Sequence, residues 1–288
     1  DGSKRHETDL CGDAAVELLM KAVGEYRRHH GIMQFGYRTA CAYDWLYGLI
    51  PESERASLNV LLFATLKEKR QVCLFDSVGL FGAAFNGQSN WSIYFAASLG
   101  PAALALHGEP GYEETFLASA ERLAAVTLNT WINTKGECGE GFSYFAHPIG
   151  EIMPFIISLK RNQLGDEVVN SNLREFPYWM TMAAGKGVTE TVSIGDCDAL
   201  RLRIPSGLRE LCSEQEDARK LWNQIPRGDA PKPEVCELLW WRPSENKPQD
   251  FSSFPLVEMF TNQGYAVLRT GFGPDDQLMT ISAPSRLG

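Results

Sequence analysis

Apolar residues recur at helical spacing along the chain up to about residue 161. In residues 10–30, for example, Leu10, Ala14, Leu18 and Val23 form one stripe, and the basic stretch "RRHHG" closes it. Short loops that carry glycine or proline separate these stripes, which is typical of antiparallel neighbouring helices. The predicted helices cover residues 10–30, 37–49, 56–70, 91–106, 112–133 and 141–161.

The pattern changes after about residue 189. One more helix is predicted over residues 208–223, and a proline-rich linker follows it. From residue 254 apolar and polar residues alternate, which predicts strands over 258–272 and 276–283, joined by the turn "GPDD". Helices first and strands afterwards predict a mainly α protein with a separate antiparallel β domain. The expected units are an all-helical domain at 1–225, a linker at 226–253 and a β domain at 254–288.

Two strands do not make a stable sheet alone. We therefore expect the β domain to continue beyond residue 288, so that this chain is a truncated part of a longer protein.

Composition narrows the function classes. With 288 residues and 44% apolar composition, the chain can bury a large core. A net charge of -9 without a basic stripe argues against nucleic acid as the main partner. No apolar run is long enough to span a membrane. The seven cysteines are scattered without a C-x-x-C pair, so no zinc site is predicted and an oxidising compartment is weakly disfavoured.

Four stretches together resemble the heparinase II/III-like polysaccharide lyases. They are "AYDWLYGLIPESER", "NGQSNWSIYFAASLGPAALAL", "GEGFSYFAHPIGE" and "NQGYAVLRTGFGPDDQLMTI", and their order along the chain is the family's order. The resemblance implies an incomplete α/α toroid followed by an antiparallel β-sandwich. It also implies an exported enzyme, periplasmic or secreted, that cleaves an anionic uronic-acid polysaccharide by β-elimination without a cofactor. We therefore expect export, although the scattered cysteines weakly disfavour an oxidising compartment.

Such an elimination needs a base and an acid near C5 and O4 of the uronic acid, and donors for its carboxylate. By resemblance, Tyr144 in "GFSYF" takes the place of the catalytic tyrosine, and Asn90 in "NGQSNW" that of the group that neutralises the carboxylate. Gln88 and Asn86 are adjacent donors, whereas Gly87 stands where heparinase II-type sequences carry histidine. Structural roles are the alternatives: Tyr144 can pack on the helical wall, and Asn90 can cap the helix that starts there.

Further candidates flank these two residues. His147 lies three residues after Tyr144 and could assist it, although Pro148 is expected to bend the chain there away from helical geometry. Glu140 could bind substrate, but it better fits the start of the helix that follows. The aromatic residues of this region could stack on sugar rings or pack in the core: Trp91, Tyr94 and Phe142.

Two other function classes remain open. A toroid glycoside hydrolase would need two carboxylates across a cleft, with Glu140 and either Asp44 or Glu151 as candidates. Otherwise, Asp44 is expected to be a scaffold residue with a buried hydrogen bond. A non-catalytic carbohydrate-binding protein is favoured by Gly87 and by the absence of the histidine-rich stretch that follows "RTGFGPDD" in complete family members.

Overall fold

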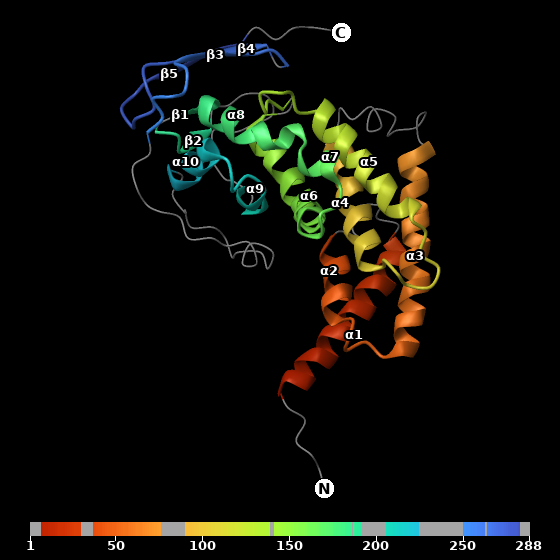
Figure 1. Cartoon of the computed structure of the whole chain (residues 1–288). Coiled ribbons are helices and arrows are strands. Elements are labelled where there is room, and N and C mark those ends of the chain that lie inside the picture. The colour runs from red at the N-terminus through yellow and green to blue at the C-terminus, as the bar shows by residue number, and fades with distance from the viewer. Residues whose placement is uncertain are drawn as a thin grey trace.

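The computed structural model describes the chain as a mainly helical protein with a small antiparallel sheet at one end (Figure 1). The described residues are 7–29, 37–75, 90–138, 141–185, 187–191, 206–224, 250–262 and 264–282. Most of the predicted linker, residues 226–249, lies outside them. In this part of the chain, no helix is both long enough and apolar enough to cross a membrane.

The helices predicted from apolar periodicity are present, with ends shifted by a few residues. α4 lies at their centre and packs against α2, α3, α5 and α6. Nearly all its residues from Asn90 to Ala103 are buried, as expected for a helix that is apolar on every side. The bounds are α1 (Glu7–His29), α2 (Tyr37–Leu46), α3 (Glu52–Phe75), α4 (Asn90–Ala105), α5 (Thr115–Thr130) and α6 (Phe142–Asn162).

α6 corrects one expectation. Pro148 and Pro154 both lie inside it, so His147 is helical and the chain does not leave the helix there. A proline inside a helix costs about 3 kcal/mol, because it removes a backbone hydrogen bond and crowds the preceding turn. Burial of the apolar face of α6 offsets this cost; its fully buried side chains include Ile149, Ile152, Phe155 and Ile156.

Shorter elements follow α6, and residues 208–223 do not form the single helix predicted for them. A turn at 212–215 separates α9 from α10. Lys160 of α6 donates hydrogen bonds to the backbone oxygens of Glu210 and Leu211, at 3.2 and 3.3 Å, and so caps the end of α9. The elements are α7 (Asp166–Val169), η2 (Asn172–Glu175), α8 (Phe176–Ala183), β1 (Ala184–Gly185), β2 (Glu190–Thr191), α9 (Ser206–Leu211) and α10 (Glu216–Gln224).

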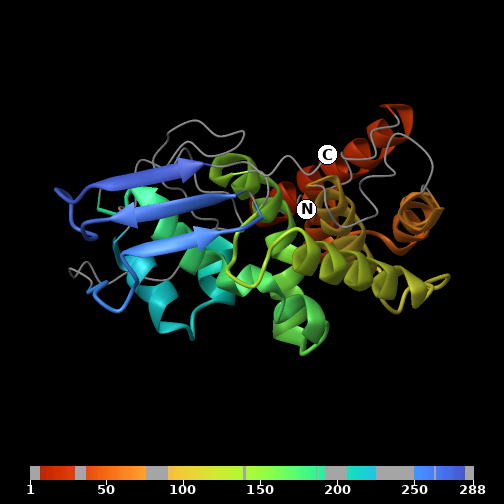
Figure 2. The same cartoon turned by 90° about the horizontal axis from the view of Figure 1, so that it is seen from above.

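β1 and β2 form a two-stranded sheet. The larger sheet contains β3 (Val257–Phe260), β4 (Tyr265–Arg269) and β5 (Leu278–Ser282), in the order β3-β4-β5. Figure 2 shows these strands side by side, at the opposite end of the molecule from α1. All neighbours are antiparallel. Residues 258–272, predicted as one strand, are therefore a hairpin, because residues 261, 262 and 264 lie in a turn between β3 and β4.

The two faces of this sheet differ in burial. Phe260, Tyr265 and Val267 point into the core that the sheet shares with the helices. Val257 and Met259 of β3 and Met279 and Ile281 of β5 are exposed. Apolar side chains therefore lie on both faces of the sheet, and the helical part covers only one of these faces.

Candidate functional site

The two stretches predicted to carry the chemistry meet where the start of α4 packs on the first half of α6. Asn90 is the first residue of α4 and is only 6% exposed. Trp91, beside it, is 40% exposed, and Tyr94 follows one helical turn after Asn90. The fold thus brings the asparagine stretch and the tyrosine–histidine stretch together, although 53 residues separate Tyr94 from His147.

A hydrogen bond joins the two helices at this point. The Tyr94 hydroxyl lies 2.5 Å from Nδ1 of His147. The two rings are tilted by 55° with centroids 5.9 Å apart, so the contact runs through polar atoms and not through stacked faces. His147 is exposed, and it can therefore bind a ligand through the part of its ring that Tyr94 does not contact.

An ion pair lies one turn further along α6. Arg38 of α2 approaches Glu151 with an N–O distance of 3.3 Å. The Arg38 side chain is 60% exposed, so the pair adds little stability. The sequence pattern gave no signal for Arg38, because only the packing of α2 on α6 brings it to Glu151, one turn after His147.

Tyr144 lies in the first turn of α6, three residues before His147, and the structure describes its backbone only. α6 begins at Phe142, and Gly141 precedes it with a φ of 83°, a left-handed backbone conformation that favours glycine. The remaining predicted residues of this site lie outside the described part of the chain: Asn86, Gly87, Gln88 and Glu140.

Of the two alternatives for Phe142, core packing is confirmed, because Phe142 is buried and stacks on Trp179 at a centroid distance of 4.1 Å. The prediction for Asp44 is wrong: Asp44 is exposed, so it does not make the buried hydrogen bond expected of it. Its neighbour Tyr43 does so instead, donating to Oδ1 of Asn59 at 2.7 Å.

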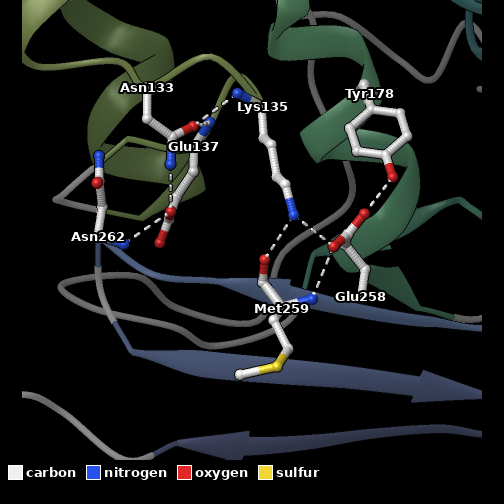
Figure 3. A network of polar contacts seen from close by, with 7 residues as sticks. All are labelled: Asn133, Lys135, Glu137, Tyr178, Glu258, Met259 and Asn262. Carbon is white, nitrogen blue, oxygen red and sulfur yellow. Dashed lines mark hydrogen bonds and ion pairs between the residues drawn. The ribbon is translucent and has the colours of Figure 1, made fainter.

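A second polar cluster holds the sheet on the helices (Figure 3). Glu258 of β3 accepts from Lys135 Nζ at 2.7 Å, from the Tyr178 hydroxyl of α8, and from the amide of Met259. Burial by itself would raise the pKa of Glu258, but these hydrogen bonds outweigh it and the pKa lies below its ordinary value. The carboxylate is therefore held in its charged form at the junction.

The same junction contains a fully buried carboxylate, that of Glu137. Its Oε2 accepts from Nδ2 of Asn133 at 2.6 Å and from the backbone amide of Asn262 at 2.9 Å (Figure 3). Because Asn262 lies in the hairpin between β3 and β4, Glu137 ties that hairpin to the turn after α5. These contacts join the sheet to the helical part.

Among the described residues, no group of three or more histidine, cysteine, aspartate or glutamate side chains could hold a metal ion. The side chains of the candidate site offer hydrogen-bond donation from an amide and a guanidinium, and proton exchange at a tyrosine or an imidazole.

No family model matches the chain, and no curated protein matches it.

Proposed function

We propose that this protein is a polysaccharide lyase of the heparinase II/III-like type. Its substrate would be an anionic, uronic-acid-containing polysaccharide, cleaved without a cofactor in the periplasm or outside the cell. In the reaction the C5–H bond breaks, a double bond forms between C4 and C5, and the C4–O4 bond breaks as the leaving oxygen takes up a proton. The helical part would be an incomplete α/α toroid, and the small sheet would belong to an antiparallel β-sandwich.

The hydrogen bond between Tyr94 and His147, which joins the α4 end that Asn90 starts to the first turns of α6, is the observation that carries this proposal. The C5 proton becomes acidic only when the neighbouring carboxylate is neutralised, so donors must gather where a base can reach C5. Asn90 starts one of the two helices, and Tyr144 and His147 occupy the first turns of the other. Tyr144 is the proposed base, and it would return its proton to O4.

The surroundings suit an anionic sugar chain. Arg38, which pairs with Glu151 one turn after His147, supplies an exposed cation in a protein whose net charge is -9. Trp91 supplies an exposed aromatic face, and sugar rings pack on such faces through their C–H groups. A local cation and an aromatic surface let an acidic protein bind an acidic polymer.

The experiment is incubation with a panel of uronic-acid polysaccharides, with detection of the conjugated C4–C5 double bond by ultraviolet absorbance. Elimination forms this bond and hydrolysis does not. New reducing ends without absorbance would overturn the lyase proposal in favour of a glycoside hydrolase, with Glu140 and either Asp44 or Glu151 as the candidate carboxylates. Binding without cleavage would show a carbohydrate-binding protein.

The tyrosine is tested by Tyr144→Phe, which removes one hydroxyl. We expect a loss of elimination of about 100-fold or more, the usual contribution of general acid–base catalysis. Tyr112→Phe is the control, since Tyr112 lies beyond the other end of α4 and packs on Phe116. Unchanged elimination in Tyr144→Phe would refute the assignment.

A further inference from the structure

We infer that Tyr94 is a positioning residue, which holds His147 in the tautomer that carries its proton on Nε2. His147 then presents an N–H donor to the substrate carboxylate and serves uronate recognition. This inference deepens the proposed function and rests on it for the identity of the ligand.

The backbone around both side chains is fixed. Tyr94 lies between Ile93 and Phe95, which are buried in the core, so α4 cannot turn about its axis without exposing them. In α6, Phe145 and Ile149 are fully buried on either side of His147. The distance of 2.5 Å between the Tyr94 hydroxyl and Nδ1 is thus set by two anchored helices.

Acid–base chemistry decides which group donates. A neutral imidazole has one nitrogen that donates and one that accepts. A phenol hydroxyl loses its proton near pH 10, whereas a neutral imidazole N–H is a far weaker acid, and the imidazole nitrogen is a better acceptor than the phenol oxygen. The tyrosine therefore donates to Nδ1, and the proton of the neutral ring resides on Nε2.

This tautomer determines the role of His147. A neutral ring with its proton on Nε2 cannot accept a proton from C5 at that atom, so His147 is not the base. The same atom can donate to an anionic oxygen without changing its protonation state. Arg38, paired with Glu151 one turn along α6, adds a positive group on the same side.

The tautomer can be read without substrate. Long-range ¹H–¹⁵N spectra of the ¹⁵N-labelled protein separate protonated from unprotonated ring nitrogens, and His147→Gln assigns the signal among the five histidines. At a pH where the ring is neutral, we expect an unprotonated Nδ1 and a protonated Nε2. Tyr94→Phe should yield a mixture of tautomers, and Tyr112→Phe should leave the signal unchanged. A protonated Nδ1 in the native protein, or no change in Tyr94→Phe, would overturn the inference.

The recognition role is tested by two substitutions that place an amide differently. Glutamine at position 147 puts its NH₂ group near the position of Nε2, and asparagine puts it near that of Nδ1. We expect His147→Gln to stay within a few-fold of native affinity for a uronate oligosaccharide. His147→Asn should lose about tenfold or more, as for a lost hydrogen bond to a charged group.

Equal affinities in the two variants would reduce the Tyr94–His147 contact to a link between helices and overturn the recognition role. If the native protein shows the expected tautomer but gives no elimination product and binds no uronate, the proposed function fails while the tautomer assignment stands. The two failures are therefore distinguishable.

Discussion

Replacing Glu258 with glutamine tests the charge-based attachment of the sheet to the helices. The side chain keeps its shape but loses its charge, and one of its two oxygens becomes an NH₂ group. Lys135 and Tyr178 both donate to this carboxylate. In the variant the NH₂ group faces either the ammonium of Lys135, which cannot accept, or the Tyr178 hydroxyl, which must then accept in place of donating to a charged oxygen. The Glu258 side chain is only 15% exposed, and water therefore replaces the lost contact poorly.

The expected cost follows from the two contacts. Lys135 is 46% exposed, so its share is that of a surface ion pair, about 0.5 kcal/mol. The hydrogen bond from half-buried Tyr178 to a charged acceptor contributes about 1.5–2 kcal/mol. We expect Glu258→Gln to lower the free energy of unfolding by about 2 kcal/mol and the melting temperature by about 4 °C.

The pH dependence gives an independent check. The folded-state pKa of Glu258 lies below its unfolded value, so the charged form adds stability above the unfolded pKa. That stability is lost as the pH falls through the folded pKa. Urea unfolding at pH 7 should therefore separate native protein and variant by the full difference, and the difference should shrink below about pH 4.

The control is Glu214→Gln, since Glu214 also has a lowered pKa from Lys160 and Arg174 but its side chain is 64% exposed. There we expect a loss of at most about 0.5 kcal/mol. Equal stability of native protein and Glu258→Gln at pH 7, or a difference that grows in acid, would refute the reasoning.

Four further substitutions test the packing by chemical denaturation. Gly136→Ala should prevent stable folding, because Gly136 has a φ of 76° and an added Cβ would lie 2.1 Å from a backbone oxygen of η2; normal stability would contradict this geometry. Val267→Ala should cost about 1–3 kcal/mol because Val267 is fully buried, whereas Met259→Ala, at a residue 63% exposed, should cost less than about 0.5 kcal/mol; equal effects would show that the sheet faces are misassigned. Tyr43→Phe should cost about 1–2 kcal/mol, since it leaves the buried Oδ1 of Asn59 without its donor, and a neutral result would mean that water replaces the hydroxyl.

Periodicity predicted the helices around α4 because their apolar stripes are long and each faces the core. It failed where tertiary contacts decide the local structure. Pro148 predicts a break, but burial of the α6 face keeps the helix intact. The sequence of residues 208–223 predicts one continuous helix. In the structure Lys160, some 50 residues earlier in the chain, donates to a backbone oxygen at the end of α9, and a turn follows there. No local pattern contains that information.

The candidate site was predicted in part. Resemblance selected the start of α4 and the first turns of α6, and the fold places these segments together. The hydrogen bond between Tyr94 and His147 was not predictable, because it depends on how two helices rotate about their axes as they pack. Arg38 gave no signal at all, since an exposed arginine on a helix is most often only a solvated side chain.

The stretch from Gly136 to Glu151 shows how burial separates structural from chemical roles among similar polar residues. Glu137 is fully buried and its carboxylate binds the β3–β4 hairpin, so its replacement would act on stability. His147, ten residues later, is exposed. Its neighbours Phe145 and Ile149 are buried and fix α6 in the core. An exposed imidazole that makes one hydrogen bond to a tyrosine adds little stability to the fold. The core fixes the two helices, and the helices in turn fix the direction of the Nε2 atom of His147. For this reason we place recognition at His147 and not at the more heavily hydrogen-bonded acids of the junction.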